Sequence, residues 1–138
     1  MALTRGVRNN NPFNVIKSSS RWLGLKPKYQ CSDPVFCEFV EMKYGIRCGL
    51  ILLRRYIQVY HLSDVRGIIS RFAPSSENDT EVYIKFVENN MRSDGFTTTD
   101  IEYGTFKFYS MCLAILRYES YFYTTPQYLD SIRKYFGL

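Results

Sequence analysis

The segment that decides the fold of this chain is Leu113-Ala114-Ile115-Leu116-Arg117-Tyr118-Glu119-Ser120. It ends an apolar run that begins near Phe106, and a segment that is apolar on nearly every face predicts a helix inside the protein. Glu119 therefore emerges from the core at the C-terminal end of that helix. The negative pole of the helix dipole and nearby aromatic surface both favour its protonated form. This pattern indicates a general acid of the kind that cleavage of a glycosidic bond requires.

A second interpretation stays open for the same residue. Most glutamates at helix ends are solvated, so Glu119 can instead end its helix in water or pair with Arg117 or Arg133. No other carboxylate has an equal claim to a catalytic role. Glu77 lies beside a predicted helix start and is expected to cap it. Asp33 has the pattern of a turn residue and Asp79 that of a cap residue.

Length and composition indicate one domain over residues 1–138 with a sizeable core. Aromatic residues make up 17% of the chain, which supplies rigid surfaces for packing or for stacking on sugar rings and nucleobases. The net charge of +5 favours polyanions of several kinds without choosing among them. Because no run of five basic residues occurs, dedicated nucleic-acid binding is not expected.

Cysteine and histidine usage argues against a metal site. The four cysteines form no CxxC pair and His61 is the single histidine, so these spacings make neither a zinc ribbon nor a zinc finger. We therefore expect no metal and no cofactor. No stretch approaches 18 consecutive apolar residues, and the first residues lack the apolar core of a signal peptide, so no membrane span is expected.

The remaining patterns predict a mainly α (α+β) domain. Residues 1–30 are rich in Asn and Ser and predict a structured loop with a short extended piece at 15–17. Residues 35–40 are dense in β-formers and predict a strand that pairs with that piece into a small β element. The spacing of apolar residues then predicts an amphipathic helix from about 43 to 60.

Three further helices are predicted by caps and breakers. Ser63 can cap a short helix that Pro74 closes. Asn78 with a glutamate three residues on fits a capping box, which opens a helix with Val82, Phe86 and Val87 facing inward. The last helix follows the buried one and has Pro126 in its first turn.

Several ordered blocks resemble a family found in tailed-phage and prophage genomes. These blocks are Arg5-Gly6-Val7-Arg8-Asn9-Asn10-Asn11-Pro12-Phe13-Asn14-Val15, Trp22-Leu23-Gly24, Phe39, Tyr44-Gly45-Ile46-Arg47, Arg71-Phe72-Ala73-Pro74 and Glu77-Asn78-Asp79-Thr80. Members of that family carry an RNNNPGNIR-like opening and an RWAP…ENDT block. They are usually described as virion structural proteins or virion-associated peptidoglycan hydrolases. The resemblance covers roughly residues 5 to 120.

A second resemblance implies a mechanism. The opening at residues 10–15 is similar to the NNLFGIK-type segment of bacterial β-N-acetylglucosaminidases of lysozyme-like fold, and residues 116–120 resemble the Glu-Ser signature of lytic transglycosylases. In those enzymes the glutamate helix precedes the asparagine-rich segment, whereas here nothing helical is predicted before that segment. Our hypothesis is a circularly permuted lysozyme-like domain, since permutation is tolerated where termini lie close together at the surface.

The resemblance implies a peptidoglycan-cleaving glycosidase, lytic transglycosylase or muramidase-like, with Glu119 as single acid and base and peptidoglycan glycan strands as partner. Such a protein is virion-associated, or is made in the host cytoplasm without a signal peptide, and acts at the bacterial cell wall. The expected substrate-binding residues are Ser120, Asn10, Asn11, Asn14, Trp22 and Tyr44.

Alternatives remain for these residues. The asparagine side chains can hydrogen-bond their own loop instead of acetamido groups. Trp22 can pack on the core instead of a sugar, and Tyr44 can anchor the first turn of its helix.

Two positions depart from the resembled patterns. Phe13 replaces a glycine and is expected to narrow the cleft, and the glycine after the Glu-Ser pair is absent, which is expected to alter the turn that aims the acid.

The competing function class is a non-catalytic phage virion structural protein. Such a protein would retain a lysozyme-like fold and use its aromatic cleft to bind other virion proteins. A nucleic-acid-binding module is a third class, which depends on charge and aromatic content alone.

Overall fold

The computed structural model describes residues 2–75 and 79–138, and within them the chain is mainly helical with almost no strand. The helical elements are α1 (Arg5–Arg8), the 3-10 turn η1 (Lys28–Gln30), α2 (Met42–Gln58), α3 (Val65–Phe72), α4 (Thr80–Ser93), α5 (Phe106–Ser120) and α6 (Pro126–Tyr135). The predicted mainly α class is confirmed. The five longer helices correspond to the five predicted ones, and α1 is an additional single turn before the asparagine-rich loop.

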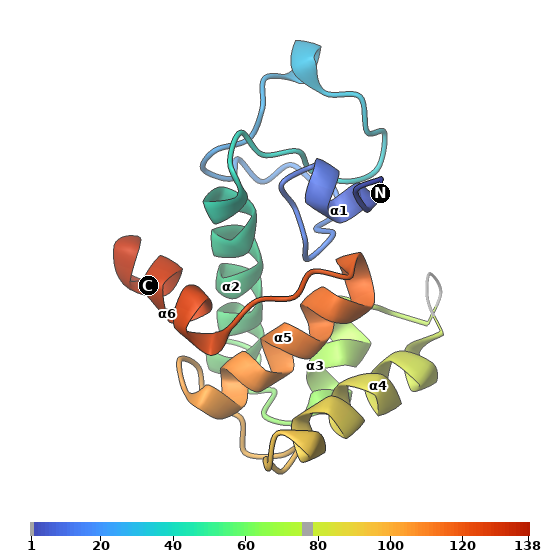
Figure 1. The fold of residues 1–138 in the computed structure, drawn as a ribbon, viewed down its shortest axis with the longest axis vertical. Helices are drawn as coiled ribbons and strands as arrows, with labels where there is room; N and C mark the ends of the chain where they lie inside the picture. The colour runs from blue at the N-terminus through green and yellow to red at the C-terminus, as the bar shows by residue number, and fades with distance from the viewer. Residues whose placement is uncertain (1, 76–78) are drawn as a thin grey trace.

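Helix α5 is the centre of the molecule. It packs against α4, α6 and α1, and Figure 1 shows it crossing between α2 and α4. Ten of its residues are buried, so the predicted burial is confirmed. Phe106 is the exception with an exposed fraction of 61%, because it occupies the first position of the helix, where the chain enters from solvent.

Helix starts follow the expected chemistry with two corrections. Asp64, not Ser63, caps α3 by accepting a hydrogen bond from the Gly67 amide at 2.8 Å. Asp79 caps α4, as predicted. Val87 is fully buried and Phe86 is partly buried against the core, as predicted, whereas Val82 is 53% exposed, so the prediction for Val82 is wrong. The proposed capping residue Asn78 and its neighbour at 77 lie outside the described residues.

The predicted β element is present only as two isolated antiparallel bridges, Ile16 with Phe36 and Leu25 with Phe39. The Asp33 carboxylate explains why residues 35–40 do not form a longer strand. It accepts hydrogen bonds from the amides of Val35 and Phe36 at 2.9 and 2.8 Å, so these groups are not available to a ladder.

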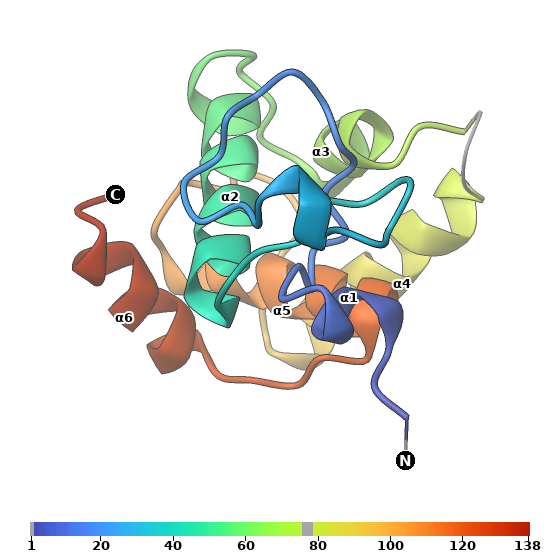
Figure 2. The same cartoon turned by 90° about the horizontal axis from the view of Figure 1, so that it is seen from above.

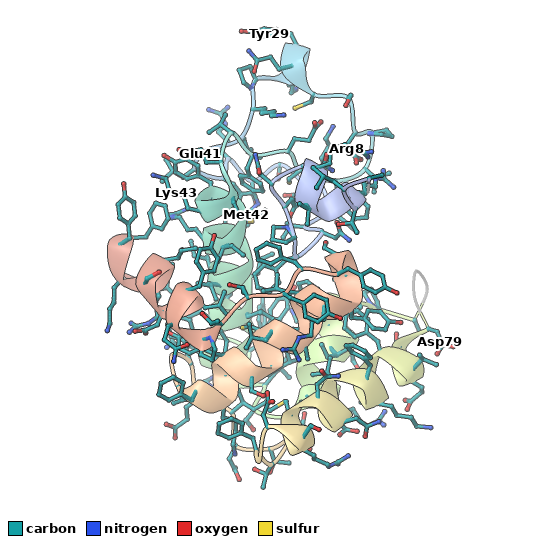
Figure 3. The ribbon with its side chains drawn as sticks, viewed as in Figure 1. Arg8, Tyr29, Glu41, Met42, Lys43 and Asp79 are labelled. Carbon is teal, nitrogen blue, oxygen red and sulfur yellow. The ribbon has the colours of Figure 1, made fainter. Side chains whose placement is uncertain are left out.

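Residues 2–41 form an N-terminal lobe that lies against one end of the helices. Figure 2 shows this lobe from above, over the C-terminal end of α5, and Figure 3 places Tyr29 at its outer tip. The lobe approaches α2 closely at Gly49, where a Cβ atom would lie 2.1 Å from the ring of Phe13. A glycine is therefore required at that turn of α2, and Phe13 enters the core fully buried.

Candidate functional site

The Glu119 side chain lies in the last turn of α5, partly buried, and both of its carboxylate oxygens accept hydrogen bonds from neutral donors. Asn14 Nδ2 donates to Oε1 at 3.0 Å and the Tyr83 hydroxyl donates to Oε2 at 2.8 Å. Within residues 2–75 and 79–138 no basic side chain forms an ion pair with this carboxylate. Burial therefore dominates and raises the pKa of Glu119, although the two hydrogen bonds act in the opposite direction.

The arginines that were alternative partners of Glu119 contact other groups. Arg117 donates to Asn90 Oδ1 at 3.0 Å, and Arg133 contacts Tyr109 and the carboxylate of Asp130. Neither arginine neutralises Glu119, so its carboxyl has no counter-ion among the described residues.

Asn14 connects the N-terminal lobe to the acid. Its backbone has a left-handed φ of 54°, and its Nδ2 atom donates to the backbone carbonyl of Glu119 at 3.1 Å as well as to the carboxylate. The adjacent Gly6 has no room for a side chain, because a Cβ atom there would lie 1.9 Å from Ser120 Oγ and 2.9 Å from Asn14 Oδ1. This close approach holds Asn14 against the end of α5.

Tyr83 is a site residue that the sequence analysis missed. Its ring is fully buried and stacks on the Tyr118 ring at 3.8 Å between centroids, which leaves its hydroxyl directed at Glu119. Burial and the neighbouring Glu119 carboxylate raise the pKa of Tyr83 well above its usual value. The hydroxyl therefore stays protonated and remains a hydrogen-bond donor at neutral pH. The spacing of Tyr83, Val87 and Met91 at intervals of four was the available signal for an inward face.

Glu119 and Asn14 open into a cleft of about 680 Å³ between the N-terminal lobe, α2 and α3. Among the described residues that line the cleft, Glu119 is the one carboxylate and Arg71 the one cation. The others are mostly apolar or hydroxyl-bearing. The lining consists of Asn14, Val15, Ile16, Ser18, Ser20, Trp22, Val35, Phe36, Leu52, Tyr56, Arg71, Phe72, Ala73, Pro74 and Glu119.

Of the predicted site residues, the structure brings Glu119, Asn14 and Trp22 together in this cleft. Trp22 is partly buried and also contacts the core, so the packing and stacking interpretations coexist. Ser120 lies just behind the acid. It is 1% exposed, and its hydroxyl donates to the Pro12 carbonyl at 2.8 Å, which ties the end of α5 to the lobe.

The other predicted positions face away from the cleft. Asn10 donates to the Phe39 carbonyl at 3.0 Å, and fully buried Asn11 donates to the carbonyls of Val15 and Cys37 at 3.0 and 2.9 Å. These amides hold their own loop together. Tyr44 packs on Phe136 of the segment after α6, with 5.7 Å between ring centroids.

The two departures from the resembled motifs have local explanations. Phe13 does not line the cleft; it is buried against Gly49 and therefore does not narrow it. Tyr121, which follows the Glu-Ser pair, adopts the left-handed conformation that glycine favours, with φ of 49°, and its amide donates to the Arg117 carbonyl at 3.0 Å. The turn after Glu119 is thus formed without a glycine, with backbone strain at Tyr121.

Residues 2–75 and 79–138 contain no cluster of three His, Cys, Asp or Glu side chains that could hold a metal ion, and the four cysteines are free thiols. None of the described helices is both long and apolar enough to cross a membrane.

No family model matches this chain. The chain is similar to Protein P5 of Pseudoalteromonas phage PM2, with 45% identity over 86 residues. The similarity covers 62% of this chain and 54% of the phage protein, so the chain spans about half the length of the relative that it matches. The chain is therefore a homologue of a phage protein, and the predicted phage relationship is confirmed at that level.

Proposed function

We propose that this protein is a peptidoglycan-cleaving glycosidase that uses Glu119 as its single general acid and base. The observation that carries the proposal is the desolvated carboxyl of Glu119, which lies in an open cleft without a cationic partner. Such a group holds its proton at a higher pH than a solvated glutamate does, and a protonated carboxyl can donate to a leaving oxygen.

The reaction begins with the glycosidic bond between N-acetylmuramic acid and N-acetylglucosamine. Glu119 donates its proton to the bridging oxygen, the bond between this oxygen and the anomeric carbon breaks, and an oxocarbenium-like centre remains. The 6-hydroxyl of the N-acetylmuramic acid then attacks its own anomeric carbon. The proton of this hydroxyl passes to Glu119, and the product is a 1,6-anhydro sugar. Attack by water instead gives simple hydrolysis.

Glu119 is the one carboxylate among the described residues that line the cleft, and this favours a route with a single catalytic residue. Most glycosidases place two carboxylates about 5 to 10 Å apart across the scissile bond. Glu119 has no such partner among the described lining residues, so the substrate's own hydroxyl is the natural second reactant.

Five residues contribute to substrate binding or to the position of the acid and its loop. Trp22 offers an aromatic face for a sugar ring at the cleft wall. Asn14 and Tyr83 hold the Glu119 carboxylate from two sides and act as positioning residues. Ser120 and Asn11 position the acid and the loop without touching substrate, because their polar groups are already paired within the protein.

A permuted lysozyme-like order is supported by a contact between residues that are 116 positions apart. Thr4 Oγ1 donates to the Ser120 carbonyl at 2.7 Å, and α1 packs on α5. The segment that precedes the asparagine-rich loop therefore begins next to the C-terminal end of the glutamate helix. In the resembled enzymes these two pieces are consecutive in the chain, with the glutamate helix first. In this chain α6 follows the glutamate helix instead.

The phage homologue is compatible with this function. We infer a virion-associated role, or synthesis in the infected host, with action at the bacterial cell wall. A non-catalytic virion component that binds other virion proteins through the same cleft is the competing proposal, because the aromatic lining alone would serve either purpose.

The test is release of fragments from purified sacculi, read by mass spectrometry. We expect the wild type to release muropeptides with 1,6-anhydro ends, and Glu119→Gln to release at least 100-fold less while it remains folded. Glu102→Gln, at an exposed position outside the cleft, is the matched control and should keep full activity. Absence of fragments from several types of sacculi would favour the virion component.

A further inference from the structure

A second hollow of about 340 Å³ lies in the N-terminal lobe beside the cleft, and three lysine residues line it. Its lining includes Lys17, Lys26 and Lys28 together with Glu38. Ser18 and Ser20 line both this lysine pocket and the Glu119 cleft, so the two hollows meet at these serines. A polymer that occupies the cleft can therefore reach the lysine pocket with its substituents.

The charge balance of the lysine pocket favours an anion. Glu38 is already occupied, since its Oε2 atom accepts from the amides of Ser32 and Asp33 at 2.8 and 2.9 Å, and its Oε1 atom lies 4.0 Å from the Lys26 ammonium. Within the described parts of the chain, Lys28 forms neither a salt bridge nor a side-chain hydrogen bond. The pocket thus carries excess positive charge that its own carboxylate does not neutralise.

The same bias extends over the whole lobe. Residues 2–41 contain six basic and three acidic side chains, so the lobe carries three of the five net positive charges of the chain. Figure 3 shows Tyr29, the neighbour of Lys28, at the outer end of the lobe. Lys17 and Lys28 are exposed and Lys26 is partly buried, so solvent reaches the lysines of the pocket.

We propose that the lysine pocket binds the carboxylates of the peptide substituents that peptidoglycan carries on its muramic acid residues. This inference rests on the proposed function, because it requires the glycan backbone to lie in the Glu119 cleft. The protein would then distinguish peptide-bearing glycan from neutral glycans such as chitin by charge, at a distance from the bond that is cleaved.

The test measures binding in the Glu119→Gln background, where the polymer stays intact. Sacculi are used untreated or with their carboxyl groups converted to neutral amides. We expect Lys26→Gln/Lys28→Gln to weaken binding to untreated sacculi roughly 3- to 30-fold at low salt, and to leave binding to amidated sacculi unchanged. The control Lys85→Gln/Arg92→Gln removes two exposed cations of α4 and should stay within about twofold of the parent.

Three results would overturn the proposal: unchanged binding of the lysine variant, equal losses on both kinds of sacculi, or competition by inorganic phosphate together with insensitivity to amidation. The last result would assign the pocket to phosphate-bearing polymers. Fragment release by the otherwise wild-type protein from untreated sacculi is scored separately. If fragments are released but the lysine variant binds as tightly as its parent, only the pocket proposal is rejected. If no fragments are released but the lysine variant binds more weakly, only the proposed function is rejected.

Discussion

Replacing Glu119 with Gln tests the physical state of the carboxyl apart from any activity. Gln has nearly the same shape, and its amide can accept from Asn14 Nδ2 and donate to the Tyr83 hydroxyl, so both hydrogen bonds persist. What the substitution removes is the ability to ionise. Because burial raises the pKa of Glu119 in the folded state, the folded wild type binds this proton more tightly than the unfolded chain does.

The sign of the pH dependence follows from this difference. The stabilisation by the protonated carboxyl is fully present below its unfolded pKa of 4.5 and is lost as pH rises through the folded pKa. Each tenfold difference between the two acid constants is worth about 1.4 kcal/mol. Between pH 4 and pH 7 we therefore expect Glu119→Gln to gain unfolding free energy relative to the wild type, by that amount for each tenfold difference.

The assay is urea unfolding of both proteins at several pH values, with the difference between them taken at each pH so that other titrating groups cancel. Leu116→Ala serves as a contrast on the same helix, since this fully buried side chain should cost about 2 to 5 kcal/mol at every pH. If Glu119→Gln lost stability as pH rose, the carboxylate would be stabilised in its ionised form and the argument for a raised pKa would be wrong.

Three further predictions concern the surroundings of the acid. Tyr83→Phe removes a donor to the Glu119 carboxylate, so the pKa of Glu119 should rise further and the alkaline limb of the pH–rate profile should move to higher pH; a shift to lower pH would contradict the assigned donor. Asp33→Asn should cost about 3 kcal/mol at pH 7 in urea unfolding, because the Arg5 guanidinium and backbone amides hold the pKa of this carboxyl well below its usual value. That contribution is present above the unfolded pKa of 3.8 and is lost as pH falls, so a cost that persists undiminished at pH 2 would refute it. Tyr121→Gly should raise stability by about 0.5 to 1 kcal/mol in thermal unfolding, since the 77% exposed ring gives up little contact; a lower Tm would mean that the left-handed backbone is not strained.

The sequence predicted the helices well where apolar periodicity was strong. Helix α5 has apolar residues on almost every face, which only burial satisfies. On α4 the sequence predicted the inward positions of Phe86 and Val87, but it assigned Val82 to the core in place of its neighbour Tyr83. The length of the β element was overestimated because no local pattern indicated that the Asp33 carboxylate would accept hydrogen bonds from the amides of Val35 and Phe36.

The site was predictable only in part, for a related reason. Glu119 and Asn14 carry local signals, a carboxyl at the end of a buried helix and an asparagine-rich loop. Tyr83 approaches from a separate helix, and its hydroxyl meets Glu119 only through the packing of α4 on α5. Asn11 has the same residue type as Asn14, yet its neighbours in space are backbone carbonyls. Sequence spacing does not distinguish these two asparagines.

The most direct measurement is a crystal structure of Glu119→Gln with a muropeptide tetrasaccharide. We predict that the sugar chain lies in the cleft beside Trp22 and Phe72, with one glycosidic oxygen about 3 Å from the side-chain amide of residue 119. A glycan bound on another face, or one in the cleft with no glycosidic oxygen in reach of residue 119, would contradict the account.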